Sequence, residues 1–370
     1  MGIKPKIDYF LAGIVGLLLF LAILILTSAS AFLSEEKVGI SNYYLKHQIV
    51  YGILPGLFLL WVFLKIKKET LEKLVLPLFL LNLIFLILVF IPPFTSSAKG
   101  ASRWFNLGPI AFQPSEFLKI SFILYLASWL KTRTGPILKK EHSLLSKNLI
   151  IFLAILLPII FLLIKQPDLS TLGIICIVAF LMYFLSGAPL KDILVIFLIG
   201  FLIFSIFIFL APYRLTRFLT FLNPQLADSM GKGWHAKQIL ITIGSGGWKG
   251  LGLGLSRQRF GFLPESMSDS IFAIYAEEIG FIGSVGLIFL FLLFLRQGFK
   301  IANRAGNSFL KFAAFGITCW ITIQAFLNIA GMIGLFPLAG IPLPFLSYGG
   351  SAIIAELAGV GILLNVSKQS

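Results

Sequence analysis

The stretch FGFLPESMSDSIFAIYAEEIGF, residues 260–281, gathers acidic side chains where a polar loop runs into an apolar segment. The chain has only fifteen Asp and Glu residues among 370, and four of them lie here: Glu265, Asp269, Glu277 and Glu278. A carboxylate at such a boundary can accept a proton from a substrate hydroxyl as a general base. The spacing of Ser266 and Asp269 also fits a helix capping box, in which Asp269 is structural. Both interpretations of Asp269 stay open on these residues.

A second group of polar residues, KGASRWFNLGPIAFQPSEFLK, covers residues 99–119. Pro114 suits the first position of a helix, with Gln113 just outside it. Glu116 and Lys119 are three residues apart and therefore neighbours on one helix face. They either satisfy each other and close the helix end, or line a polar cavity reached from outside, with Arg103 nearby.

Three further carboxylates fall inside apolar segments, at Glu277, Glu278 and Glu356. An ionisable side chain at such a depth is costly unless it faces a polar interior. The three residues either pair with other groups for packing or line a path through the protein.

The elements that hold these residues are predicted from composition. Apolar residues make up 58% of the chain and charged residues 12%, and the mean hydropathy is +0.98. Continuous apolar runs of about 20 residues are long enough to cross a membrane as helices. The sequence predicts an all-α polytopic membrane protein, a single membrane domain over residues 1–370. About ten spans are expected, at 8–29, 43–64, 74–92, 113–130, 148–164, 169–186, 193–211, 270–295, 310–332 and 351–367.

The distribution of basic residues predicts the orientation of the spans. With the N-terminus inside, most Lys and Arg residues fall in inner segments, while the short outer loops hold Lys37, Lys99, Arg103 and Lys165. Both termini are therefore expected in the cytoplasm. The net charge of +15 is interpreted as this topology signal plus attraction to anionic membrane lipids, and not as a sign of nucleic-acid binding.

One long outer segment, residues 212–269, is expected between the seventh and eighth spans. Such long loops tend to carry function. Its basic residues outnumber its acidic ones, which suits a phosphate or diphosphate ligand, although contact with lipid headgroups is an equal alternative for each basic residue. The basic residues are Arg214, Arg217, Lys232, Lys237, Lys249, Arg257 and Arg259, and the acidic ones are Asp228, Glu265 and Asp269. The run GSGGWKGLGLG lacks the Lys-Ser/Thr ending of a nucleotide-binding P-loop and is interpreted as flexible backbone near a substrate. The segment QILITI is too short to span and is expected to lie along or re-enter the outer leaflet.

Histidine and cysteine give no sign of a metal site. His47, His142 and His235 are far apart in the sequence, and Cys176 and Cys319 fall inside predicted spans. A zinc site and a Ser-His-Asp triad are therefore not expected.

Four segments together resemble the SEDS family of bacterial shape, elongation, division and sporulation proteins. They are GASRWFNLGPIAFQPSEFLK, KQPDLSTLG, GSGGWKGLGLGLSRQRFGFLPESMSDSIFAIYAEEIG and PLPFLSYGGS, which occur in family order along nearly the whole chain. The region GSGG and the stretch SRQRFGFLPE look more like the cell-division branch, FtsW, than the elongation branch, RodA.

The resemblance implies a peptidoglycan glycosyltransferase that polymerises lipid II on the outer face of the bacterial cytoplasmic membrane. Its essential acid, the Asp after the LPE motif, falls on Asp269, although Met267 stands where the family usually has His. The family's Glu and Lys of QPSE-x-x-K fall on Glu116 and Lys119, and its Arg-Trp pair on Arg103 and Trp104.

The expected substrate-binding residues are therefore Arg103, Glu116, Lys119, Lys249 and Arg257, with Asp269 catalytic. No protein metal ligands are assigned, but Mg²⁺ or Mn²⁺ could assist the diphosphate leaving group. The resemblance also implies a class B penicillin-binding protein as partner. Two alternatives remain, a lipid II flippase and a divisome scaffold without chemistry.

Overall fold

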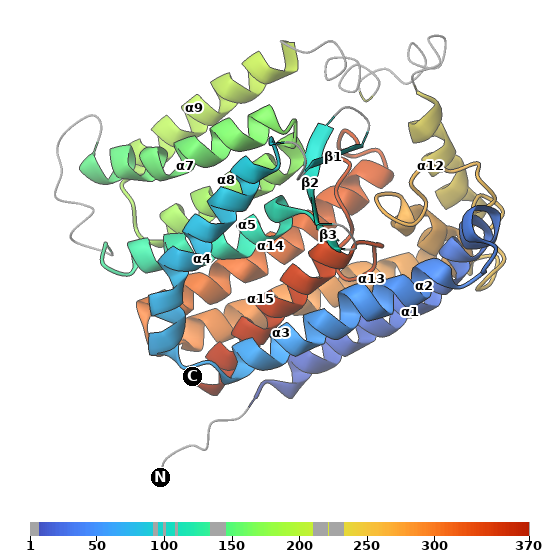
Figure 1. Cartoon of the computed structure of the whole chain (residues 1–370), viewed down its shortest axis with the longest axis horizontal. Coiled ribbons are helices and arrows are strands. Elements are labelled where there is room, and N and C mark those ends of the chain that lie inside the picture. Colours follow the sequence, from blue (N-terminus) through green and yellow to red (C-terminus); the bar gives the residue numbers. More distant parts are fainter. Residues whose placement is uncertain are drawn as a thin grey trace.

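The computed structural model describes residues 7–91, 95–98, 101–107, 110–133, 146–209, 221 and 233–369, and most of these residues lie in helices (Figure 1). The helices are α1 (Tyr9–Val38), α2 (Tyr43–Gln48), the π-helix η1 (Ile49–Ile53), α3 (Leu54–Lys65), α4 (Lys68–Leu88), α5 (Pro114–Leu130), α7 (Lys147–Lys165), α8 (Leu169–Leu185), α9 (Leu190–Phe209), α12 (Trp234–Ser245), α13 (Ile271–Arg304), α14 (Ser308–Met332) and α15 (Gly350–Lys368). Each predicted span overlaps one of them, so the helical membrane class is confirmed.

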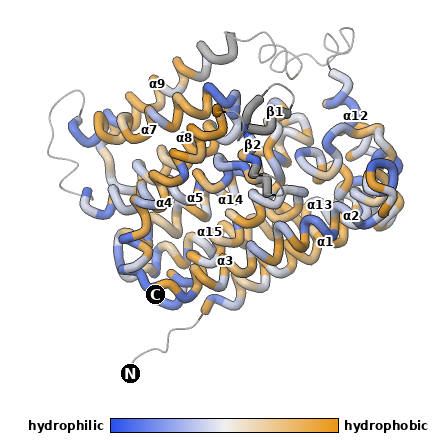
Figure 2. The backbone as a smooth tube through the Cα atoms, in the orientation of Figure 1, coloured by the Kyte–Doolittle hydropathy of each residue, from blue (hydrophilic) through white to orange (hydrophobic). Residues whose placement is uncertain are grey.

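Seven of the described helical segments are long and apolar enough to cross a membrane, with residues 43–65 counted as one. The helices differ in how much of this apolar surface is covered. The most apolar windows of α14 and α15 are 78% and 83% buried, whereas that of α4 is only 28% buried. Apolar side chains such as Leu190 and Phe197 on α9 stay largely exposed, and the peripheral helices are hydrophobic along their length (Figure 2). Exposed apolar surface of this extent fits a lipid environment. The count of ten spans and the side of the termini stay predictions.

A small antiparallel sheet, β1 (Thr95–Ala98), β2 (Ala101–Leu107) and β3 (Ile110–Phe112), adds to the helical class and was not predicted. Phe105 and Phe112 face each other across β2 and β3. Their rings lie 5.4 and 5.3 Å from that of Phe85 on α4, measured between centroids. Aromatic packing thus fixes the sheet on the bundle next to the start of α5.

The predicted outer segment, residues 212–269, is described only in part. Arg214, Arg217, Asp228 and Lys232 lie outside the described residues, as does Lys99. The segment QILITI lies within α12, which lies at the end of the molecule away from both termini (Figure 1).

The glycine-rich run GSGGWKGLGLG, at and after the end of α12, packs against α13 where that helix is interrupted. At Gly280, φ is 78° and ψ is −170°, so the helix hydrogen bonds from Phe281 and Ile282 to Glu277 and Glu278 are lost. The run replaces them: Phe281 N donates to Gly247 O (2.9 Å) and Ile282 N to Trp248 O (3.2 Å). In return, Leu251 N and Gly252 N donate to the carbonyls of Glu277 and Glu278, at 2.9 and 3.0 Å.

The sequence predicted that these glycines make a flexible backbone near a substrate. In the structure they allow the backbone of the run to pack closely against α13. A Cβ atom on Gly250 would overlap the carbonyl of Glu278, and one on Gly246 would overlap that of Ala276. Glycine is needed because backbone meets backbone there. The run therefore positions the polar loop over α13.

Substituting Gly250 by Ala tests the docking. Gly250 and Gly254 share a φ of +79°, but a Cβ on Gly254 would meet no atom within 4 Å. Both changes strain the left-handed backbone, and only Gly250→Ala adds the clash, at about 1–3 kcal/mol. Gly250→Ala should therefore lower the thermal unfolding midpoint in detergent clearly more than Gly254→Ala. Equal midpoints for the two variants would contradict this account of the break.

Candidate active site

Asp269 lies in a turn that precedes α13 and is half-buried. Ser268 N and Ser270 N both donate to Glu265 O at 3.1 Å, and Glu265 has a positive φ of 51°. The helix begins at Ile271 with Ser270 as its N-cap, which makes no side-chain capping bond. The capping-box interpretation of Asp269 is therefore wrong, because the chain completes the turn before the helix starts.

Three consecutive carbonyls of this turn are bound from distant parts of the chain. Tyr348 N donates to Met267 O (2.8 Å), and Ser347 Oγ donates to Ser268 O (2.6 Å). Asn328 Nδ2 donates to Asp269 O (2.9 Å). The position of Asp269 is thus set by α14 and by the segment before α15.

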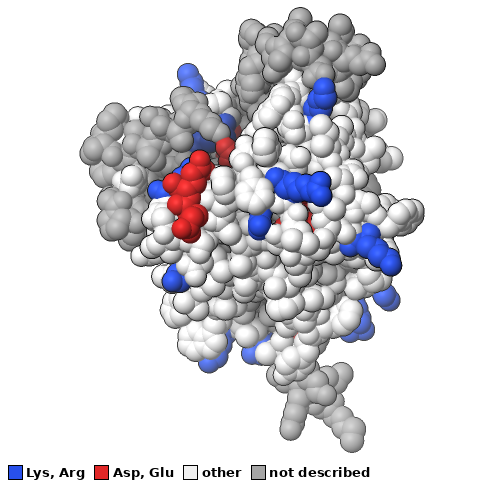
Figure 3. All heavy atoms as spheres, turned by 90° about the vertical axis from the view of Figure 1, so that its right-hand side faces the viewer, with Lys and Arg blue, Asp and Glu red and all other residues white. Residues whose placement is uncertain are grey.

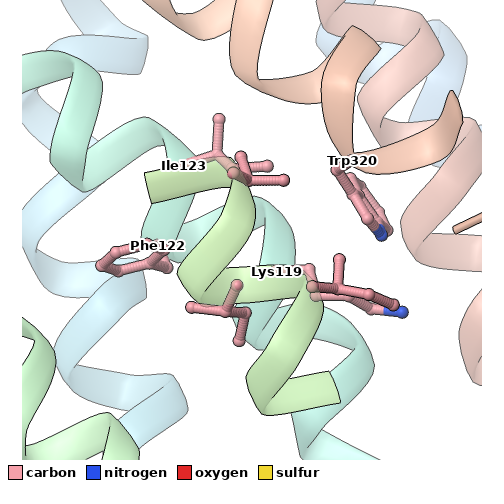
Figure 4. A pocket seen from close by; sticks show the side chains of 7 residues that line it. Lys119, Phe122, Ile123 and Trp320 are labelled. Atoms are coloured by element: carbon pink, nitrogen blue, oxygen red, sulfur yellow. The ribbon is translucent and has the colours of Figure 1, made fainter. Parts of the chain in front are cut away.

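Glu116 and Lys119 form the expected pair, and both are buried. Lys119 Nζ lies 2.7 Å from Glu116 Oε2, and the exposed fractions of the two side chains are 2% and 5%. Lys119 Nζ also donates to Gln324 Oε1 at 2.8 Å. It lies 5.2 Å from the centroid of the Trp320 ring, beside an apolar pocket with no space for a water-sized molecule (Figure 4).

These contacts favour one of the two predicted roles of the pair. The ammonium group of Lys119 is surrounded by protein partners, and it lies too deep to meet a ligand outside the bundle in this conformation. The arrangement supports a positioning role at the start of α5, while direct substrate binding by Glu116 and Lys119 stays a prediction.

Polar residues on α14 connect this pair to Asp269. Trp320, Gln324 and Asn328 are four residues apart and share one helix face. Gln324 accepts from Lys119, and Asn328 donates to the carbonyl oxygens of Asp269 and Ile341. Gln324 and Asn328 were not predicted as part of the site, although two amides at this spacing in an apolar helix were a usable signal.

The buried glutamates hold loops in place. Glu277 Oε2 accepts from Ser256 Oγ (2.5 Å), and its Oε1 accepts from Arg257 N (3.3 Å). Glu278 accepts from Ser28 on α1. Glu356 Oε2 accepts from the backbone N of Phe345 at 2.8 Å. These bonds support the packing interpretation of the three glutamates over a path through the protein.

The predicted basic ligands lie in different surroundings. Arg103 donates from Nε to Gln166 O (3.2 Å) and from Nη2 to Pro167 O (2.5 Å), which ties β2 to the corner between α7 and α8. Lys249 and Arg257 are exposed on the docked loop. The approach of these three side chains to a common ligand with Asp269 stays a prediction.

The segments that the sequence analysis singled out nevertheless meet in space. Ser115 Oγ donates to Asp168 Oδ2 (3.0 Å), which joins the start of α5 to the start of α8. Gln113 N donates to Ser351 Oγ (3.0 Å) on α15. Together with the bonds from Ser347 and Tyr348 to the Asp269 turn, these contacts bring all four segments to one end of the bundle.

Two other side chains at this end were not predicted to approach Asp269. His235 Nε2 lies 3.1 Å from Ser270 Oγ, next to Asp269. Ser270 is fully buried, so this contact holds α12 against α13 and does not present a nucleophile. Tyr348 OH lies 2.9 Å from His47 Nδ1.

Metal ligands are sparse in the described part of the chain. No group of three or more His, Cys, Asp or Glu side chains there could hold a metal ion. A role for Mg²⁺ or Mn²⁺ stays a prediction.

A family model described as a cell cycle protein, covering FtsW, RodA and SpoVE, matches residues 9–370, so the chain belongs to this family. It is 36% identical over 374 residues to stage V sporulation protein E of Bacillus subtilis, covering 99% of this chain and 98% of that protein. It is also 36% identical over 345 residues to a probable peptidoglycan glycosyltransferase FtsW of Trichlorobacter lovleyi, covering 93% and 89%.

Solved structures agree with this assignment. A chain of a peptidoglycan synthase complex superposes with a TM-score of 0.79 at 30% identity, over 98% of both chains. The rod shape determining protein RodA of Thermus thermophilus gives 0.71 at 27% identity, over 98% of this chain and 97% of that one. The expected family and membrane fold are thereby confirmed.

The buried pair of Glu116 and Lys119 yields a stability prediction. Lys119→Met or Glu116→Gln alone leaves a partner without its counter-charge, which typically costs about 3–5 kcal/mol. The double variant removes both charges and should unfold at a higher temperature in detergent than Lys119→Met. If the decreases in unfolding temperature of the two single variants simply add in the double variant, the two side chains do not act as a pair.

Proposed function

We propose that this protein is a peptidoglycan glycosyltransferase that polymerises lipid II, with Asp269 as its general base. The observation that carries the proposal is the meeting of four sequence segments at the end of the bundle that holds the Asp269 turn. The resemblance to proteins named as peptidoglycan glycosyltransferases supports the reaction class. The preference for a role in cell division over elongation rests on the motif comparison in the sequence.

The reaction joins two sugars and releases a lipid diphosphate. The 4-hydroxyl oxygen of one sugar attacks the anomeric carbon of another, and the bond from that carbon to the diphosphate oxygen breaks with its electrons. The hydroxyl proton passes to the carboxylate of Asp269. Such a positioned base typically contributes about 10²–10⁴-fold to the rate. A single displacement inverts the anomeric carbon and needs no protein nucleophile.

Basic side chains stabilise the leaving diphosphate in this proposal. Lys249 and Arg257 are exposed on the loop that docks on α13, and Arg103 lies at the corner between α7 and α8. Fixed cations of this kind favour the charge that develops on the leaving group. Lys119 and Glu116 contribute by positioning α5. Mg²⁺ or Mn²⁺ stays a separate prediction and would supply further positive charge to the diphosphate.

The membrane position follows from the same chemistry. The lipid tail of the substrate stays in the bilayer, while its sugars and diphosphate lie at the surface. Asp269 lies at the end of α13, and the basic residues of the inner segments predict that this end faces outward from the cytoplasmic membrane. The active site is therefore proposed to face the outside.

A class B penicillin-binding protein is the proposed partner. The similar chain of known structure belongs to a peptidoglycan synthase complex, which supports an assembly of this kind. In it, the partner would crosslink the strands that this protein polymerises. Membrane lipids are the remaining expected partners.

Neutralising Asp269 tests the proposed base. Asp269→Asn cannot accept the hydroxyl proton, so polymer formation from purified lipid II should fall by about 10²-fold or more. Glycan strands resolved on a gel, from detergent-solubilised protein with its partner, give the readout. Glu36→Gln, which removes an exposed carboxylate near the end of α1, is the matched control and should polymerise normally.

Long strands from Asp269→Asn protein would refute its role as the base. Polymer formed in detergent also separates the enzyme from a flippase, because flipping requires sealed vesicles. A protein that moves labelled lipid II across vesicles but makes no polymer would be the transporter. Normal division in cells that carry only Asp269→Asn would favour the scaffold.

A further inference from the structure

The segment that connects α14 to α15, residues 341–349, supplies two of the donors that hold the Asp269 turn. Ser347 Oγ and Tyr348 N both donate to carbonyl oxygens of that turn. This connector forms neither helix nor strand, and its residues 343–347 are buried. Because it lacks a regular hydrogen-bond ladder, its backbone groups have to be satisfied one at a time by other partners.

The connector closes on itself at the residue that reaches the turn. Ser347 N donates to Leu343 O at 3.0 Å, and Leu343 N donates to Ser347 Oγ at 2.7 Å. A serine hydroxyl has a single proton, and that of Ser347 is donated to Ser268 O at 2.6 Å. The position of this hydroxyl, and with it a bond next to Asp269, therefore depends on the shape of the loop.

Phe345 lies in the middle of this loop and has a strained backbone. Its φ is 65°, which a bulky residue rarely adopts. Such a conformation persists only where the surroundings hold it. The side chain is 1% exposed, and its ring centroid lies 6.2 Å from that of Phe294 on α13. The backbone N of Phe345 donates to Glu356 Oε2 on α15 at 2.8 Å, so a buried carboxylate holds the strained residue.

Glu356 acts from inside the protein. It is 2% exposed, and its Oε1 has no hydrogen-bond partner among the described residues. Lys119 and Glu116 lie within electrostatic reach of it. The acidic side chains visible on the surface at the end that carries α2 and α12 are few and lie mostly together (Figure 3). A buried carboxylate with one unbonded oxygen costs stability, so stability alone does not account for a glutamate at this position.

We propose that Glu356 is a positioning residue for Asp269. By holding Phe345, it keeps Ser347 and Tyr348 in the arrangement that binds the Asp269 turn, and so sets where the base lies relative to the sugar hydroxyl. This inference rests on the proposed function and adds to it a residue that contacts no substrate. A misplacement of about 1 Å can lower a rate by roughly 10²-fold, so a small shift of the turn is enough.

Two substitutions of Glu356 separate its hydrogen bond from its charge. Glu356→Met removes the acceptor at similar volume, whereas Glu356→Gln keeps a side-chain oxygen that can accept from Phe345 N. In lipid II polymerisation, Glu356→Met should lower kcat by about 10- to 100-fold and change KM by less than about 2-fold, because the cations proposed for the diphosphate are untouched. Glu356→Gln should restore kcat to within about 2-fold of the wild type.

Asn365 provides a matched control on the same helix. It is 7% exposed, and its Nδ2 donates to Phe63 O and Ile66 O, both at 2.7 Å, near the opposite end of α15. Asn365→Leu removes these buried hydrogen bonds far from the Asp269 turn. It should lower the thermal unfolding midpoint in detergent, as Glu356→Met does, but leave kcat unchanged.

Hydrogen–deuterium exchange tests the coupling without catalysis. Glu356→Met should speed exchange in peptides that cover residues 266–270 and 343–349, while Glu356→Gln and Asn365→Leu should leave both as in the wild type. If the wild type makes no polymer, the proposed function fails, and this measurement still decides the coupling. Unchanged kcat, or unchanged exchange at 266–270, in Glu356→Met would overturn the inference.

Two further outcomes would also overturn it. A loss of kcat as large in Glu356→Gln as in Glu356→Met would assign the effect to the charge of the carboxylate. An equal loss in Asn365→Leu would assign it to the general stability of the bundle.

Discussion

The carbonyl oxygens of Met267, Ser268 and Asp269 must find hydrogen-bond donors at the end of a helix bundle whose surroundings are mostly apolar. Backbone groups left unpaired in such a place cost about 2–7 kcal/mol each. Tyr348, Ser347 and Asn328 supply those donors. The turn that presents Asp269 therefore depends on side chains and backbone more than fifty residues away in sequence.

The same constraint explains where the protein places its few buried ionisable side chains. Glu277 and Glu356 accept hydrogen bonds from the loops that they hold, and Lys119 is held by Glu116 and Gln324. A buried ionisable group is tolerated only when it is paired or well bonded, so each of them ties two elements together. The chain thereby builds a bonded frame at one end of the bundle, while Lys249 and Arg257 on the docked loop stay exposed.

The break in α13 links this frame to the outer loop. Its lost helix bonds are replaced one for one by the backbone of residues 247–252. The loop that carries Lys249 and Arg257 is consequently fixed relative to the helix that follows Asp269. In the proposed reaction, the base and the cations for the leaving group therefore have a common support.

Much of the helical frame and one local contact could be read from the sequence alone. The apolar runs predicted the spans because a helix satisfies its own backbone, and Pro114 marked the start of α5 as expected. The pair of Glu116 and Lys119 was predictable because residues three apart on a helix are always neighbours. The family resemblance identified Asp269 as the residue to examine.

Only the tertiary structure decided what surrounds these residues. The local spacing of Ser266 and Asp269 was compatible with a helix cap, but contacts from α14 and from Ser347 and Tyr348 hold the segment as a turn instead. The glycine run looked flexible because its docking place in α13 is distant in sequence. The partner of Gln324, Lys119, likewise lies about 200 residues away in sequence, so local periodicity could not indicate it. Local bonding rules determine helices, whereas long-range packing determines which polar groups meet.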